Sequence, residues 1–375
     1  MSLYTPFRYD FVGSFLRPES LKQARADFEA KKITMDRLKQ VEDQAITDLI
    51  FKIKSLGYHV ITDGEFRRST WHLDFMWGFH GIEHRKTEDG NTTFEGEPAM
   101  IDDTLLVDKL YVDQHPFVEH FKFVKQFEDS ATVAKQTIPS PGQMYAFFTG
   151  AEQLAHTLTI YKSKDEFAED IIRGYQKVIR ELYDAGCRNV QFDDCVWGGL
   201  VNKKIALALT GETEQTLPAL IDRLVYINNS VIADKPDDLV VNTHVCRGNY
   251  HSTFFSSGAY DAIAEPLFGR EHVNAYYLEY DDERSGSFGA LKHVTDSKKV
   301  VLGLITTKRP QLEDKDAVIA RIRQAEQYIP LDRLYLSPQC GFASCEIGNK
   351  LTEEEQWKKL ALVREIAEEV WGKER

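Results

Sequence analysis

The sequence predicts a closed (β/α)8 barrel, the TIM barrel fold, with an insertion after the second strand. Short apolar runs alternate with longer amphipathic stretches along almost the whole chain of 375 residues. Most runs are apolar throughout, which is typical of parallel strands that helices cover on both faces. Eight such βα units in a row favour a closed barrel. An open doubly wound sheet is the alternative, but the chain lacks the glycine-rich turn of a dinucleotide-binding sheet.

The predicted elements follow one another in barrel order. Strands are predicted over residues 11–14, 59–65, 132–137, 189–194, 239–246, 274–279, 299–305 and 333–337. Helical periodicity predicts helices over residues 35–56, 166–185, 215–233, 316–328 and 353–371. Gly57 and Gly186 directly follow two of these helices, as is common at helix ends. We expect residues 1–375 to form a single catalytic barrel.

One segment does not follow the βα alternation. Residues 70–127 are polar, aromatic and irregular, and residues 92–96 resemble one arm of a hairpin. We interpret the segment as an insertion that forms a flap or a small subdomain over the barrel mouth.

Composition excludes several classes of partner. The formal charge of −13 argues against nucleic acid or an anionic membrane as the main partner. No apolar run approaches the roughly 20 residues that span a bilayer, and the N-terminus lacks the pattern of a signal peptide. Five cysteines, an odd and sparse number, indicate a reducing compartment. We therefore expect a cytoplasmic protein, and a homodimer is left open as its assembly.

Four residues at predicted strand ends suit a metal ion. His244 and Cys246 end the fifth strand two residues apart, so their side chains face the same side. Glu279 ends the sixth strand and Cys340 follows the eighth. The carboxyl ends of barrel strands converge on one face, and thiolates with an imidazole favour zinc over magnesium or calcium. An isolated His-x-Cys pair is usually a buried histidine beside a buried thiol. Zinc is favoured here because all four residues lie at predicted carboxyl ends of strands. Cys345 is interpreted as a packing thiol.

This metal site would be catalytic if one ligand can be exchanged. A substrate thiol that replaced Glu279 would have its pKa lowered by zinc and would be held as a thiolate nucleophile. A closed site of four protein ligands would instead be structural.

Other polar residues end the strands on the same predicted face. Glu65 and Asp193 lie at the ends of the second and fourth strands, where carboxylates could bind an amino group or transfer a proton. Capping of the next helix or loop explains them about equally well. Ser14 ends the first strand beside Gly13, and its hydroxyl and the nearby amides could bind a carboxylate.

Together these motifs resemble the C-terminal catalytic half of cobalamin-independent methionine synthase. The matching segments are residues 12–15 (VGSF), 63–66 (DGEF), 190–194 (VQFDD), 242–246 (NTHVC), 278–279 (LE) and 338–341 (PQCG). They occur in the family's order and span nearly the whole chain. The resemblance implies a barrel with zinc at its mouth. It also implies methyl transfer from a methyltetrahydrofolate, in polyglutamylated form, to the thiolate of homocysteine, which gives methionine.

The resemblance also assigns a role to individual residues. The residues that match the family's zinc ligands are His244, Cys246, Glu279 and Cys340. Ser14 matches a residue that contacts the amino-acid carboxylate, and Glu65 and Asp193 match the carboxylates that hold its amino group.

The chain departs from the two-barrel synthases in ways that bear on the methyl donor. The two-barrel synthases carry an additional N-terminal domain of similar size, and we expect this chain to belong to a short, single-barrel subgroup. The synthases place a histidine after the seventh strand that is thought to protonate the pterin, and Lys308 is its nearest counterpart here. Lys308 is either a replacement proton donor or an ammonium beside an anionic tail. The stacking indole of the long synthases is replaced near Phe147 and Phe148.

Other functions stay open at this point. A zinc-dependent alkyltransferase could use another methyl donor or another thiol, such as coenzyme M, which needs no ammonium-binding pair. Related barrels decarboxylate uroporphyrinogen, but they have no thiol–zinc site. A barrel with a structural zinc could be a non-enzymatic binding protein.

Overall fold

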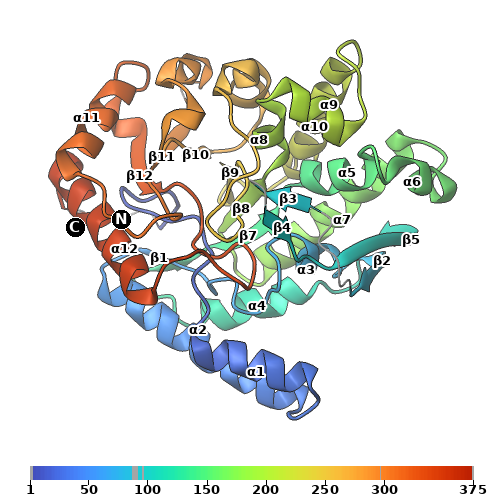
Figure 1. The fold of residues 1–375 in the computed structure, drawn as a ribbon, viewed down its shortest axis with the longest axis horizontal. Coiled ribbons are helices and arrows are strands. Elements are labelled where there is room, and N and C mark those ends of the chain that lie inside the picture. The colour runs from blue at the N-terminus through green and yellow to red at the C-terminus, as the bar shows by residue number, and fades with distance from the viewer. Residues whose placement is uncertain (1–2, 87–91, 95–96, 296, 374–375) are drawn as a thin grey trace.

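We describe the fold from a computed structural model in which residues 3–86, 92–94, 97–295 and 297–373 are described. Parallel strands occupy the centre and helices surround them (Figure 1). The barrel strands are β1 (Val60–Ile61), β6 (Val133–Ala134), β7 (Gln136–Pro139), β8 (Asn189–Asp194), β9 (Val240–Val245), β10 (Ala275–Glu279), β11 (Lys299–Ile305) and β12 (Leu334–Pro338).

All pairings between these strands are parallel, as predicted. Six of them form one sheet in the order β12-β11-β10-β9-β8-β7, and β1 pairs with β6 in a second sheet. Only Lys135 separates β6 from β7, so one stretch of chain contacts β1 on one side and β8 on the other. The predicted barrel fold is therefore confirmed.

The predicted first strand is irregular. In the described part of the chain, residues 11–14 form no strand, and the connection to β12 is a single bridge between Tyr9 and Leu336. Side-chain hydrogen bonds partly replace the backbone hydrogen bonds of a strand in this segment. For example, the Gln191 amide donates to the Val12 carbonyl oxygen at 2.9 Å. This segment lies between β12 and β1 and closes the barrel.

A buried carboxylate explains this irregularity. Asp10 Oδ1 accepts a hydrogen bond from the Phe11 N–H at 2.7 Å, which occupies a backbone donor that a strand ladder would use. Asp10 is fully buried and forms an ion pair with Lys135 Nζ at 3.1 Å, and Tyr277 donates its hydroxyl to Oδ2. The local sequence therefore satisfies the backbone through side chains.

The helices of the barrel layer agree closely with the sequence prediction. The five predicted helices correspond to α2 (Met35–Ser55), α7 (Lys164–Asp184), α10 (Leu217–Ile232), α11 (Lys315–Ala325) and α12 (Glu353–Trp371). Sequence periodicity missed α1 (Glu19–Glu29), α5 (Pro141–Thr149), α6 (Leu154–Ile160), α8 (Val196–Leu200) and α9 (Lys203–Thr210). Thr352 and Glu355 form a capping box that starts α12.

The connections from β9 to β10 and from β10 to β11 contain short helices of other kinds instead of α-helices. They are the 3₁₀-helices η1 (Tyr260–Ala262), η3 (Glu283–Ser285) and η4 (Phe288–His293), and the π-helix η2 (Glu265–Gly269). Another 3₁₀-helix, η5 (Leu331–Arg333), precedes β12. Gly286 ends η3 with a φ of +71°, whereas Pro266 lies in the first turn of η2, where proline is tolerated.

The segment 70–127 lies between β1 and β6. It contains α3 (Leu73–Met76), β2 (His80–Arg85), β3 (Thr92–Phe94), β4 (Glu97–Ala99), β5 (Asp103–Tyr111) and α4 (Pro116–Lys125). β2 pairs with β5 and β3 with β4, both antiparallel. Of the hairpin arm expected at residues 92–96, the first three residues form β3, and residues 95–96 lie outside the described residues. α4 packs against β6 and α7 of the barrel layer.

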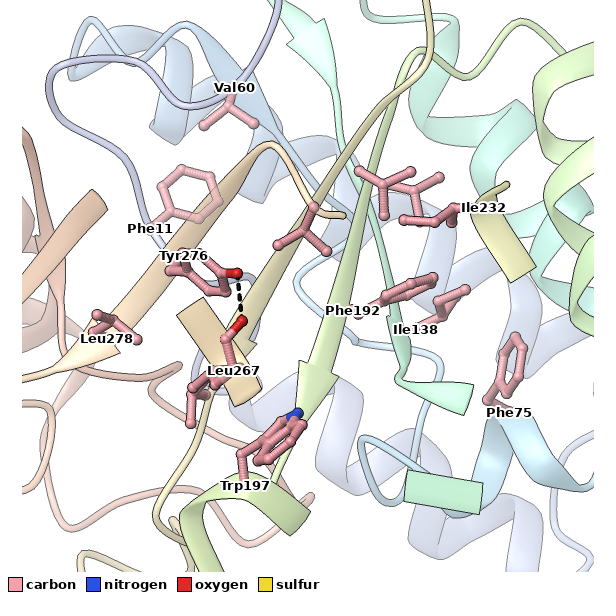
Figure 2. Packing of buried hydrophobic residues seen from close by; sticks show 14 of the residues in the cluster. Phe11, Val60, Phe75, Ile138, Phe192, Trp197, Ile232, Leu267, Tyr276 and Leu278 are labelled. Atoms are coloured by element: carbon pink, nitrogen blue, oxygen red, sulfur yellow. Dashed lines mark hydrogen bonds between the residues drawn. The ribbon is translucent and has the colours of Figure 1, made fainter. Parts of the chain in front are cut away.

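An apolar core joins the strands to their helices. Figure 2 shows Ile138, Phe192 and Tyr276 from β7, β8 and β10 within this core. The buried hydroxyl of Tyr276 donates to the Leu267 carbonyl oxygen at 2.7 Å, so its polar atom is satisfied (Figure 2). None of the helices within the described residues is long and apolar enough to cross a membrane.

Candidate metal centre and active site

Four side chains converge at the carboxyl ends of β9, β10 and β12. One ligand atom from each of His244, Cys246, Glu279 and Cys340 can be chosen so that all lie within 4.8 Å of one another. His244 is in β9 and Glu279 in β10, whereas Cys246 and Cys340 follow β9 and β12. All four are buried. The structure therefore brings together the four residues that the sequence selected.

The hydrogen bonds around this cluster leave two ligand atoms facing inward. His244 Nδ1 lies 3.2 Å from the Tyr277 carbonyl oxygen, and Nε2 has no hydrogen-bond partner among the residues that the structure describes. Glu279 Oε1 accepts from the Arg247 N–H at 2.9 Å, and Oε2 likewise has no hydrogen-bond partner within the described chain. A buried polar atom without a partner costs about 1–3 kcal/mol. A cation bound between these atoms would remove that cost.

The two thiols are also spaced as ligands of one ion. The sulfur atoms of Cys246 and Cys340 are 3.7 Å apart. Two sulfurs bound at about 2.3 Å to one tetrahedral zinc ion would be about 3.8 Å apart. Contact with Cys246, together with burial, raises the pKa of the Cys340 thiol well above its usual range. A bound divalent cation would offset this by stabilising thiolates, so the residues present fit zinc.

The predicted substrate-binding residues share one cavity with the metal cluster. Ser14, Glu65 and Asp193 line a cavity of about 820 Å³ whose wall also includes Cys246 and Cys340. His244 is a wall residue as well. The residues that the sequence selected for the amino acid and for the metal therefore line one cavity.

Glu65 occupies a strained position in this wall. Its φ is +61°, a left-handed conformation that costs a non-glycine residue about 1–3 kcal/mol. Asp63 Oδ1 accepts from the Glu65 N–H at 2.8 Å, and the Arg17 guanidinium donates to the Glu65 carbonyl oxygen at 2.8 Å. These bonds hold the backbone so that the side chain points to Thr137, whose hydroxyl donates to Oε1 at 3.1 Å. The Arg68 guanidinium lies 3.3 Å from the same oxygen.

Burial changes the ionisation of the carboxylate pair. It raises the pKa of Glu65 to about 7, with Arg68 opposing the rise and the nearby Asp193 adding to it. It also raises the pKa of Asp193 to about 7, against a hydrogen bond from Gln191. Glu65 Oε2 has no hydrogen-bond partner in the described part of the chain. A cationic group such as an ammonium would favour the ionised form of both carboxyls.

Ser14 lies at the contact between the first segment and the Cys340 loop. Its Oγ accepts from the Ala343 N–H at 3.3 Å, which leaves the hydroxyl proton to donate to a ligand. Gly341 packs directly against it, since a Cβ on Gly341 would lie 1.9 Å from Ser14 Oγ. A larger residue at position 341 would displace either Ser14 or the neighbouring Cys340.

The residues expected to act on the donor are placed differently from one another. Phe147 lines the cavity, whereas Phe148 is fully buried in the core with its ring 5.0 Å from that of Phe147. Lys308 is buried, and its Nζ donates to Asn249 Oδ1 at 3.0 Å. Asn249 is a wall residue, but Lys308 is not among the described residues that line the cavity. Of the expected donor residues, only Phe147 faces the cavity.

Two residues near the metal cluster were not selected from the sequence. Cys195 is half-buried in the cavity wall and follows β8. It directly follows Asp193 and Asp194 at a strand end, so the positional rule that selected His244 could have found it. Arg284 Nη2 lies 3.6 Å from Glu279 Oε2. No motif in the sequence identified that contact.

A family model described as "Cobalamin-independent synthase, Catalytic domain" matches residues 135–369. The chain belongs to this family. It is 42% identical to the YxjH protein of Bacillus subtilis (strain 168) over 370 residues, which are 98% of this chain and 95% of YxjH. It is 23% identical to the methionine synthase of Pyrococcus horikoshii over 335 residues, 88% of this chain and 84% of that protein. A Listeria monocytogenes structure assigned as a vitamin-B12-independent methionine synthase superposes with a TM-score of 0.76 at 34% identity, covering 99% of each chain.

Family membership confirms the resemblance inferred from the motifs. The protein is a methyltransferase of the cobalamin-independent type, and the family supports methyl transfer to homocysteine. The match begins at residue 135, so the segments that contain Ser14 and Glu65 lie outside it.

Proposed function

We propose that this enzyme binds the thiol of homocysteine at a zinc ion and methylates it to methionine. The observation that carries the proposal is one cavity that combines a His/Cys/Glu/Cys cluster with a buried carboxylate pair and a serine hydroxyl. These are the groups that a substrate with a thiol at one end and an amino acid at the other requires.

The protein side chains would hold the amino acid at both of its charged groups. Glu65 and Asp193 would accept hydrogen bonds from the ammonium as charge-assisted pairs. Ser14 would donate its hydroxyl proton to the carboxylate. Because two charged ends are fixed, the thiol reaches the metal cluster in one orientation, and orientation of this kind can supply a large share of a rate enhancement.

His244, Cys246, Glu279 and Cys340 would hold the zinc ion, which supplies a lowered thiol pKa when bound. Glu279 is the ligand best placed to give way to the substrate thiol. Its Oε2 already lies 3.6 Å from the Arg284 guanidinium, so a displaced carboxylate would keep an opposite charge beside it. The hydrogen bond from the Arg247 N–H to Glu279 Oε1 would limit how far the carboxylate moves.

For the methyl donor, the resemblance supplies methyltetrahydrofolate in polyglutamylated form. Phe147 supports this because its ring lines the cavity and could stack on a pterin. The contact of Lys308 with Asn249 gives no support to Lys308 as a proton donor. Methyltetrahydrofolate is thus the reference donor against which others are compared.

The segment 70–127 would act as a flap within a single catalytic barrel. Phe94 and Asp103 from this segment line the cavity, so it covers part of the substrate. A cytosolic location agrees with five unpaired cysteines.

X-ray absorption at the zinc edge tests the acceptor half directly. We expect one additional sulfur ligand and one fewer oxygen ligand when homocysteine is added to the zinc-loaded protein. An unchanged spectrum would indicate a structural zinc. A thiol without an ammonium, such as coenzyme M, should compete weakly, because Glu65 and Asp193 would stay buried without a cation.

A further inference from the structure

One part of the cavity wall is aromatic. Its rings belong to Trp71, Phe94, Phe147, Tyr250 and Phe255. The Phe94 ring lies 5.5 Å from that of Tyr250 and 5.7 Å from that of Phe255, so these three form one group. Faces of aromatic rings attract organic cations, and quaternary ammonium groups are bound in proteins by such groups of rings.

The same wall carries negative and no positive side chains. Asp102, Asp103 and Glu152 line the cavity in addition to the carboxylate pair that would hold the acceptor. Neither a lysine nor an arginine is found among the described residues that line it. Burial lowers the pKa of His72, another wall residue, to about 3, so its imidazole is uncharged near neutral pH.

The sequence of the covering segment has the same charge bias. Residues 87–108 contain seven acidic residues and no lysine or arginine. Cations near this segment are already paired, since Lys350 Nζ lies 3.3 Å from Glu97 Oε2 and His251 is hydrogen-bonded to the other oxygen of Glu97. A donor with several carboxylates would meet like charges here, whereas a donor with a positive charge would be attracted.

We infer that the methyl donor is an onium compound, a sulfonium or a quaternary ammonium, which would take the place of the folate that the resemblance supplies. This inference rests on the proposed methylation of a thiolate. The cavity of about 820 Å³ is large enough for homocysteine and a small-molecule donor together.

The chemistry of an onium donor also agrees with the placement of Lys308. The thiolate sulfur forms a bond to the methyl carbon as the bond from that carbon to the onium centre breaks. The electron pair of the broken bond stays on the leaving sulfur or nitrogen, which departs as a neutral sulfide or amine. The thiolate charge and the onium charge cancel, so no proton is transferred. The reaction therefore needs no proton donor, and Lys308 is not required in the cavity wall.

The test is a methyl-transfer assay on the zinc-loaded full chain, with ¹³C-backbone homocysteine so that only methylated acceptor is counted. The donors are S-methylmethionine, monoglutamyl and triglutamyl methyltetrahydrofolate, and methylcobalamin. We expect the sulfonium to be used at least a hundredfold faster than any of the others. A faster reaction with either folate, or with methylcobalamin, overturns the inference.

Methyl iodide separates failure of this inference from failure of the proposed function. It is small and uncharged and needs no donor site. Zinc-dependent alkylation of homocysteine by methyl iodide, without any use of S-methylmethionine, would overturn the onium donor and leave the acceptor half intact. Absence of enzyme-dependent alkylation with every donor, methyl iodide included, would refute both.

Two variants test the wall itself. Asp103→Asn removes a charge and Phe255→Leu removes a ring, and we expect each to raise the KM for S-methylmethionine about tenfold. The ratio of the rate with S-methylmethionine to the rate with methyl iodide should therefore fall in both. The matched controls are Asp113→Asn and Phe51→Leu, whose side chains are exposed and do not line the cavity. Tetramethylammonium, which is inert, should inhibit the wild type competitively against the donor and inhibit the two wall variants more weakly. Equal inhibition of all forms would contradict binding at this wall.

Discussion

The metal cluster and the aromatic wall face the same cavity but are built in opposite ways. The cluster of His244, Cys246, Glu279 and Cys340 lies at or just beyond the ends of barrel strands that are almost entirely buried. The aromatic wall comes from loops, a short hairpin and α5, and its rings are mostly half-exposed. A metal ion needs ligand atoms held within a few tenths of an ångström, which strand ends provide. A wall made of loops can change its charge and its rings without disturbing that geometry.

The largest expected effect comes from breaking the metal cluster. Cys246→Ala should remove most of the bound zinc and lower methyl transfer at least about a thousandfold, because zinc both orients and ionises the thiol. Zinc content by mass spectrometry and a homocysteine assay measure the two effects. Cys187→Ala is the matched control, since Cys187 is a fully buried thiol outside the cluster. Retention of zinc in Cys246→Ala would mean that the cluster is not the metal site.

The contrast between the two regions also explains what the sequence could predict. The strands that carry the metal cluster have apolar patterns, and β9, β10 and β12 begin and end within one residue of their predicted limits. Once the strand ends were known, convergence on one face of the barrel followed from the fold.

The aromatic wall could not be predicted in the same way. Phe147 and Phe148 are neighbours in α5, where successive side chains point about 100° apart. One lines the cavity and the other packs in the core, and only the packing of α5 against α7 and α10 decides which. Likewise, the first segment is irregular because the Asp10 side chain accepts a hydrogen bond from the backbone and so competes with strand pairing. A hydropathy pattern does not show this competition.

A smaller effect is expected where the metal cluster meets its supporting charges. Arg284→Met keeps the apolar stem but removes the cation 3.6 Å from Glu279 Oε2. Loss of a group that orients a metal ligand typically weakens metal affinity by about 10- to 100-fold. We expect zinc to be lost that much more readily to a chelator, as measured by competition. Arg270→Met is the control, because Arg270 forms an exposed ion pair with Asp222. Equal zinc retention in both variants would mean that Arg284 does not support Glu279.

The carboxylate pair lies between the two regions and predicts a pH dependence. Burial raises the pKa of Glu65 and of Asp193 to about 7, above unfolded values of about 4. The raised pKa values stabilise the fold below pH 4, and this contribution is lost as the pH rises through 7. An ammonium needs the ionised forms, so binding should strengthen with rising pH and level off above pH 7.

Methionine is the best ligand for this test because it has no thiol to titrate. Its Kd should fall up to about tenfold per pH unit between pH 5.5 and 7, if one proton is released on binding. Calorimetry in buffers of different ionisation enthalpy would count that proton. In Asp193→Asn the binding should be weaker and its pH dependence shallower. A Kd that is independent of pH in the wild type would contradict the assignment of this pair to the ammonium.

The smallest effect on activity is expected at Lys308, which follows β11 beside the loop that carries Asn249. Asn249 Oδ1 accepts from Lys308 Nζ at 3.0 Å and from Asn349 Nδ2 at 2.9 Å, so Lys308 supports the wall from outside the cavity. Lys308→Met keeps the length of the side chain and removes a charged hydrogen bond, which should cost about 1.5–3 kcal/mol of unfolding free energy in denaturant titration. Methyl transfer should stay within about threefold, with an unchanged pH profile. A proton donor in the reaction would instead contribute about 100-fold or more. A loss of that size with any donor, in a variant that retains zinc, would therefore mean that Lys308 takes part in proton transfer, although it does not line the cavity.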